Sequence, residues 1–133
     1  GGAGGGMAEA QELYRVAVSQ YNRGSVTTAR AAFERFLNSY PNHQLAPEAR
    51  FYLAEIMAQE NQLEEALEAF LEIPEIFPAA ERVPQALYRA GRIHEELDNP
   101  QEARQLYERV VNSYAESGAA ILAGERLEEM PQP

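Results

Sequence analysis

The stretch Ala46–Pro78, APEARFYLAEIMAQENQLEEALEAFLEIPEIFP, decides the fold of this chain. Its apolar residues recur three and four positions apart on both sides of Asn61, which is typical of two amphipathic helices joined by a short turn. Pro47 lies in a first helical turn, where a proline removes no helical hydrogen bond. The stretch therefore predicts a helical hairpin, with a first helix over 47–60 and a second over 63–77.

The same hairpin occurs three times at a period of 37 residues. Three second-helix alanines superpose at this offset, and so do three aromatic residues four positions after them: Ala29, Ala66 and Ala103, then Phe33, Phe70 and Tyr107. First-helix positions superpose as well: Tyr14, Phe51 and Tyr88, then Ala17, Ala54 and Gly91. A fixed period in this range indicates a stacked helical array, in which each hairpin packs against its neighbours.

The period predicts the remaining helices from the middle hairpin. First helices are expected over 8–22, 47–60 and 84–97, second helices over 26–40, 63–77 and 100–114, and a capping helix over 117–129. The repeats would cover about 10–46, 47–83 and 84–120 of one all-α domain over residues 8–130. Gly24, Asn61 and Asp98 fall in the same hairpin turn of successive units.

Three local features refine this picture. Asn99 before Pro100, and Asn61 with Glu64 three residues later, are expected to cap the N-termini of their helices. Pro74 lies inside the second helix of the middle unit, where it removes a backbone hydrogen bond and should kink that helix. The opening residues 1–7, GGAGGGM, read as a disordered linker added in place of the natural N-terminal region.

The composition excludes several classes of function. The net charge of −10, from 21 acidic residues against 11 arginines, repels phosphate backbones, so we expect no nucleic-acid partner. No stretch is apolar and long enough to insert into a membrane. Cysteine is absent, which excludes disulfides and thiolate metal sites and suits an oxidising compartment without establishing one.

The sequence contains no recognisable active site. His43 and His94 have no second histidine or cysteine at ligand spacing, so no metal site is expected. Glu95 and Glu96 beside His94 resemble an acid–base pair, but such neighbours are common on acidic helices. We therefore predict that the chain is not an enzyme, has no catalytic residue and carries no cofactor.

These residues resemble the tetratricopeptide repeat family, in which a small residue on each helix of a hairpin is followed by an aromatic residue and a closing proline. The resemblance implies a right-handed α-solenoid of three hairpins and a C-terminal capping helix. Two features depart from the family pattern. The period is 37 rather than about 34, with the extra residues in the 41–46 and 78–83 connections, and Leu13, Arg50 and Leu87 replace the usual opening aromatic residue.

The longer period and the Tyr40-Pro41 and Phe77-Pro78 endings are similar to bacterial cell-envelope members of this family. The likeness is greatest to the C-terminal domain of the Tol–Pal-associated periplasmic cell-division coordinator, which ends in a pair like Arg126-Leu127. The lipoprotein of the outer-membrane β-barrel assembly machine has similar spacing. The resemblance alone implies a periplasmic location, with the cytoplasm as the alternative.

In a stacked array the first helices line the concave side, where ligands usually lie. On this face we predict a partner-binding groove of nine residues: Tyr14, Arg15, Val18, Asn22, Tyr52, Glu55, Tyr88, Arg89 and Arg92. Each of the three arginines could bind a carboxylate of a partner by donating two parallel hydrogen bonds. Because Tyr14, Phe51 and Tyr88 recur at the repeat period, packing between adjacent first helices explains them as well as ligand contact does.

The function that we predict is a scaffold that binds a protein or peptide segment in this groove. The alternative is a self-assembling scaffold, in which repeat ends or grooves of two copies pack together, because truncated arrays expose apolar end surfaces. The identity of the partner, the affinity and the oligomeric state do not follow from the sequence.

Overall fold

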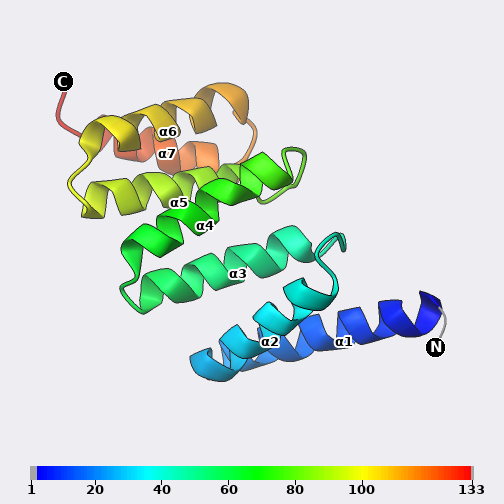
Figure 1. Ribbon diagram of the computed structural model, residues 1–133. Coiled ribbons are helices and arrows are strands. Elements are labelled where there is room, and N and C mark those ends of the chain that lie inside the picture. Colours follow the sequence, from blue (N-terminus) through cyan, green and yellow to red (C-terminus); the bar gives the residue numbers. More distant parts are fainter. Residues whose placement is uncertain (1–2, 133) are drawn as a thin grey trace.

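The computed structural model describes residues 3–132, which form helices and no strand. The helices are α1 (Ala3–Asn22), α2 (Val26–Ser39), α3 (Ala46–Gln59), α4 (Leu63–Ile76), α5 (Val83–Glu96), α6 (Pro100–Ser113) and α7 (Gly118–Glu129). Successive helices pair into three hairpins that stack along the molecule, and α7 packs against α5 and α6 (Figure 1). The prediction of an all-α solenoid of three hairpins and a capping helix is confirmed.

The predicted helix boundaries agree with these to within one residue, except at the N-terminus. Of the linker expected over 1–7, residues 3–7 belong to α1 and are helical rather than disordered, and residues 1 and 2 lie outside the described part. Glycine weakens a helix by about 0.5–1 kcal/mol relative to alanine. Extending a helix that is already anchored by the buried Ala10 nevertheless adds one hydrogen bond per residue.

The hairpin turns are equivalent in the three units, as the period predicts. Each turn contains one residue with positive φ, which is 83° at Gly24 and 63° at both Asn61 and Asp98. Glycine adopts this conformation without strain, and asparagine and aspartate tolerate it better than other residues do.

Of the two predicted N-caps, Asn61 is wrong, and Asn99 holds the predicted position without a side-chain capping bond. Asn61 is committed to the turn, so Gln62 occupies the N-cap position of α4, and its side chain makes no capping bond. Asn99 does stand at the N-cap of α6, but its side-chain amide lies 3.4 Å from Nδ1 of His94 instead of capping the helix. At the start of α7, Ser117 accepts the N–H of Ala120 through its side chain.

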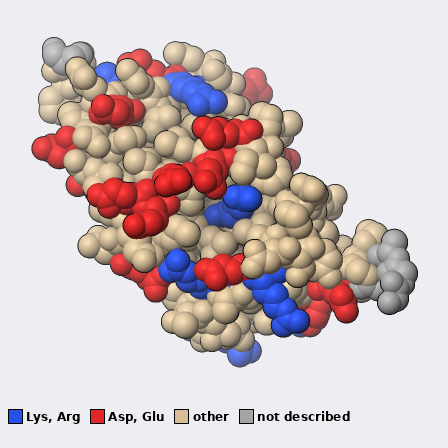
Figure 2. Space-filling view, in the orientation of Figure 1, with Lys and Arg blue, Asp and Glu red and all other residues tan. Residues whose placement is uncertain are grey.

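The helix α4 combines a proline with an acidic outer face. It runs past the buried Pro74 to Ile76, and the kink expected at this proline stays a prediction. Acidic side chains gather over α4 on the face seen in Figure 2. Four of them line one shallow hollow: Glu64, Glu68, Glu72 and Glu75.

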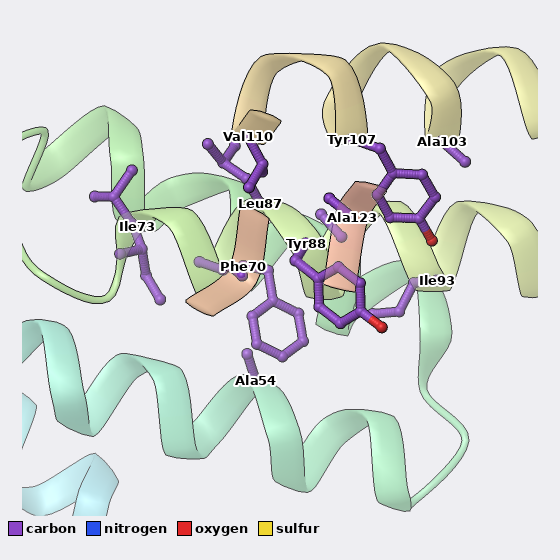
Figure 3. Close-up of a cluster of buried hydrophobic side chains, with 14 of the residues drawn as sticks. Ala54, Phe70, Ile73, Leu87, Tyr88, Ile93, Ala103, Tyr107, Val110 and Ala123 are labelled. Carbon is purple, nitrogen blue, oxygen red and sulfur yellow. The ribbon is translucent and has the colours of Figure 1, made fainter. Parts of the chain in front are cut away.

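The buried side chains form two hydrophobic clusters that meet at α3. Leu53 and Ile56 belong to the cluster shared with α1 and α2. Phe51 and Ala54 belong to the cluster that extends through α4, α5, α6 and α7, part of which is shown in Figure 3. Because α3 is buried on two faces, it joins the clusters into one continuous core.

The third hairpin contains a very close helix contact at Gly91. A Cβ atom added at Gly91 would lie 2.5 Å from Cε1 of Tyr107, far inside a normal contact distance. The Tyr107 hydroxyl donates a 2.5 Å hydrogen bond to Glu95, which holds the ring in that position. In the first two units the equivalent small residues are alanines and the equivalent rings are Phe33 and Phe70, which have no hydroxyl to hold them.

The same hydrogen bond belongs to a network that attaches α7. Arg126 of α7 donates to both carboxylate oxygens of Glu95 on α5, at 2.6 and 3.1 Å, while Tyr107 of α6 donates to one of them. Burial alone would raise the pKa of Glu95. The hydrogen bonds from Arg126 and Tyr107, with the charges of Arg126 and Arg92, outweigh burial and hold this pKa below its ordinary value.

We expect Gly91→Ala to destabilise the protein by about 1–3 kcal/mol, because the added methyl group overpacks against Tyr107. The matched control is Gly124→Ala in α7, where a Cβ would meet nothing within 4 Å. This control should stabilise the protein by about 0.5–1 kcal/mol through helix propensity alone. Urea unfolding gives the free energy of unfolding of both variants. Equal changes in this free energy would show that the Tyr107 ring leaves room for a side chain at residue 91.

We also expect the contribution of Glu95 to stability to depend on pH. Because its pKa is depressed in the folded state, its contribution is present above the unfolded pKa, about 4.3, and is lost as the pH falls through the folded pKa. The free-energy difference between wild type and Glu95→Gln should therefore be largest above about pH 5 and shrink below about pH 4. Glu96→Gln, at the exposed neighbouring position, is the control; a difference for Glu95→Gln that is constant with pH would contradict the network.

Candidate binding surface

Polar contacts join each first helix to the next. Gln59 of α3 donates to the Tyr21 hydroxyl of α1 at 2.9 Å. Between α5 and α3, Arg89 pairs with Glu55 at 2.5 Å, and Arg82 at the N-cap of α5 pairs with Glu48 at 2.8 Å. With the Arg126–Glu95 pair between α7 and α5, these contacts run along the face that was predicted to form the groove.

The four predicted residues of α1 lie together. Tyr14, Arg15, Val18 and Asn22 line one shallow, open hollow of about 520 Å³. The side chain of Arg15 is 67% exposed and pairs with Glu12 on its own helix at 2.6 Å. Burial raises the pKa of Tyr14 to about 12. The hollow therefore offers an aromatic ring beside an accessible guanidinium.

The predicted residue Tyr52 fills the space between the first two units. Its ring stacks on Phe33, with centroids 4.9 Å apart and planes 9° from parallel. It also meets the ring of Tyr21 edge-on at 4.9 Å. Tyr52 is half-buried, so one part of its ring supports the stack and the rest stays accessible on the first-helix face.

Glu55 and Arg89 are partners of each other. The guanidinium of Arg89 also lies over the ring of Phe70, 5.6 Å from its centroid. A carboxylate from a partner would have to displace Glu55 to reach this arginine. The pair therefore has a structural role between α3 and α5.

Arg92 is more available than Arg89. Its side chain is 43% exposed, donates to the Tyr88 hydroxyl at 3.1 Å and lies 3.7 Å from Glu95. Tyr88 itself is buried against Tyr107, with ring centroids 5.8 Å apart. Packing explains the predicted residue Tyr88, as it does the equivalent Phe51, whose ring lies under the guanidinium of Arg82.

The nine predicted residues thus form three groups along the first-helix face rather than one continuous site. Sequence reasoning missed two further hollows, which open at the starts of the helices. One, of about 720 Å³, lies between Tyr14 and the connections before α3 and α5. The other, of about 530 Å³, lies between the starts of α5 and α7. The lengthened connections at 41–46 and 78–83 were the feature of the sequence from which the hollow beside Tyr14 could have been predicted.

Both histidines have packing roles. Nδ1 of His43 accepts the N–H of Leu45 at 3.0 Å, and its ring meets Phe36 edge-on. His94 lies beside Asn99, at the turn between α5 and α6. Within residues 3–132, no group of three His, Cys, Asp or Glu side chains is arranged to hold a metal ion. No helix in this part of the chain combines the length and apolarity needed to cross a membrane.

Comparison with solved structures supports the fold. The N-terminal domain of stress-induced protein-1 from C. elegans superposes with a TM-score of 0.72 at 14% identity, covering 94% of this chain and 98% of that one. YrrB, described as a TPR protein with an unusual peptide-binding site, gives 0.70 at 22% identity, covering 87% and 57%. MamA gives 0.64 at 15% identity, covering 77% and 56%. This chain therefore spans little more than half the length of YrrB and of MamA.

No curated protein sequence matches this chain. A family model for the tetratricopeptide repeat matches residues 14–81, and a second such model matches residues 85–117. The two matches together reach into all three hairpins and agree with the architecture of the structure. This chain belongs to the tetratricopeptide repeat family.

Proposed function

We propose that this chain is a protein-interaction scaffold that binds a protein or peptide segment on the face formed by α1, α3 and α5. The observation that carries the proposal is the open hollow on α1, where Tyr14 and Arg15 lie together. Tyrosine and arginine are the residue types that supply binding hot spots. The tetratricopeptide repeat is a family of interaction scaffolds, and the similar structure YrrB is described as peptide-binding, which supports the same reading.

We further propose that the scaffold works in the bacterial cell envelope, in the periplasm, as a component of the Tol–Pal or cell-division type. The support is the 37-residue period, the aromatic–proline endings of the hairpins and the Arg126-Leu127 pair. Arg126 attaches α7 through Glu95, and the half-buried Leu127 packs against the core. The pair that resembles the envelope family therefore has a physical role in ending the array.

Self-assembly is the second function that a specific observation favours. Ile121 and Leu122 are 67% and 45% exposed on α7, at the C-terminal end of the array. A second copy that covered this end would remove apolar surface from water, which stabilises association. Sedimentation velocity at several concentrations separates the two functions, because only self-assembly gives a sedimentation coefficient that rises with concentration.

Arg15 and Arg92, the more exposed arginines of the predicted groove, should matter more for partner binding than for folding. We expect Arg92→Ala to weaken partner binding about tenfold or more, as truncation of an interface arginine does. The free energy of unfolding should change by no more than about 1 kcal/mol, because the ion pair of Arg92 is long and partly exposed. Arg15→Ala should act on binding in the same direction. Arg89→Ala should lower stability as well, since it breaks the contact between α3 and α5.

The measurement starts with a partner captured from a bacterial envelope extract, identified by mass spectrometry and then purified. Titration calorimetry with each variant gives the affinity, and thermal melts in parallel give the stability. Arg109→Ala on α6, also an exposed arginine, is the control. Unchanged affinity in Arg15→Ala and Arg92→Ala would move the site away from this face. Capture of cytoplasmic partners alone would contradict the envelope setting.

A further inference from the structure

The two hollows that open at the helix starts are adjacent and share one lining residue. Glu81, in the connection between α4 and α5, lines both of them. The connections before α3, α5 and α7 lie along the same edge of the molecule in Figure 1. We refer to these two adjacent hollows together as the trough, in which Tyr14 belongs to the lining of one hollow and Leu122 to the lining of the other.

The longer repeat of this chain builds the trough. A tetratricopeptide repeat usually has about 34 residues, whereas this chain has a period of 37, with the extra residues in the 41–46 and 78–83 connections. These connections supply Leu45, Ala80 and Glu81 to the lining. The hollow beside Tyr14 therefore depends on the lengthened connections, and Glu81 extends their contribution to the hollow between α5 and α7.

The hollow between α5 and α7 has a largely apolar lining, whereas the hollow beside Tyr14 has a mixed one. Pro84, Ile121 and Leu122 line the first, and Tyr14, Leu45 and Pro47 share the second with Gln44 and Glu48. Ile121 and Leu122 are adjacent and are two of the four large hydrophobic residues that the described chain exposes. An exposed apolar pair inside a hollow, rather than scattered on a convex surface, is typical of a binding site.

The charged side chains that line the trough are both acidic. They are Glu48, which pairs with Arg82 at 2.8 Å, and Glu81, which is exposed and makes no ion pair with the described residues. Arg82 is partly buried, lies over the ring of Phe51 at 4.5 Å and also donates to the side chain of Gln85. One carboxylate of the trough is therefore left without a neutralising partner.

The helix N-termini at the trough offset this charge only weakly. The second residues of α3 and α5 are Pro47 and Pro84, which have no N–H. The N–H groups of Ala46 and Val83 already donate to carbonyls in the preceding connections. At α7, the Ser117 side chain accepts the N–H of Ala120. Most of the donors that would attract an anion to these helix starts are thus absent or engaged.

We infer that the trough binds a partner segment that is apolar and carries lysine or arginine, with the basic side chain at Glu81 and an apolar side chain between Ile121 and Leu122. The net charge of −10 adds a long-range attraction for a basic segment. This inference rests on the proposed function, because it names the chemistry of the partner. It adds a recognition element that the first-helix arginines do not provide.

The test measures binding of fluorescein-labelled peptides to the whole chain by anisotropy. The three peptides have equal length. In each of them leucine alternates with a second residue, which is arginine in the first peptide, glutamate in the second and glutamine in the third. The leucine–arginine peptide should bind at least about tenfold more tightly than the others, and its affinity should fall with added salt. Glu81→Gln should weaken it about two- to fivefold, as the loss of an exposed ion pair does, and Leu122→Ser should weaken it about tenfold or more.

Each variant has a matched control. Glu68→Gln removes an exposed carboxylate on the outer face of α4, and Ile76→Ser removes an apolar side chain with an exposure of 48%, close to that of Leu122. Neither residue lines the trough, so neither change should alter the affinity. Circular dichroism melts confirm that all four variants remain folded.

Several outcomes would overturn the inference. One is that the leucine–glutamate peptide binds more tightly than the leucine–arginine peptide. Another is that neither Glu81→Gln nor Leu122→Ser changes the affinity for the leucine–arginine peptide. If the envelope partner binds and depends on Arg15 and Arg92 but not on Glu81 or Leu122, the inference fails while the proposed function stands. If no peptide and no envelope partner binds, and a concentration-dependent oligomer disappears in Leu122→Ser, the trough is a contact between copies and both proposals fail.

Discussion

The close approach of paired helices at small residues is the constraint on which the rest of this structure depends. Ala29, Ala66 and Ala103 on the second helices are fully buried, as are Ala17 and Ala54 on the first helices. Any larger side chain there would separate the backbones, because protein interiors are close-packed and leave no room for extra methylenes. Once this distance is set, the aromatic residue of each second helix is held against its partner helix, and equivalent hairpins stack.

At the C-terminal end of the array, a modified form of this close helix contact attaches the capping helix α7. In the third hairpin the ring is a tyrosine, and Gly91 makes room for it. The Tyr107 hydroxyl is then directed to Glu95, which presents its carboxylate to Arg126. A capping helix normally needs a polar outer face and a firm attachment. Here the same carboxylate serves both the close helix contact and the attachment of α7.

The fold was predictable from the sequence because its determinants repeat at fixed spacing within each unit. The binding surface was less predictable, since its contacts join residues of different units. Arg15 and Arg89 are the matching arginines of the first and third units, yet Arg15 pairs with Glu12 on its own helix, whereas Arg89 pairs with Glu55 of the preceding unit. Periodicity identifies equivalent positions but carries no information on which side chain across an interface completes each pair.

This pairing determines what a partner would meet. Arg82, Arg89 and Arg126 are each neutralised by a glutamate of a neighbouring first helix, so these pairs add no net charge to the middle of the first-helix face. Within the described part of the chain, unpaired acidic charge lies elsewhere: on the outer face of α4, where Glu72 alone of the four glutamates pairs with an arginine, Arg50, and at Glu81 in the trough. A near-neutral aromatic surface favours apolar contact, while a charge at its edge favours one orientation of the bound segment. Apolar contact along the first helices and charge at the connections would therefore act on different parts of the same partner.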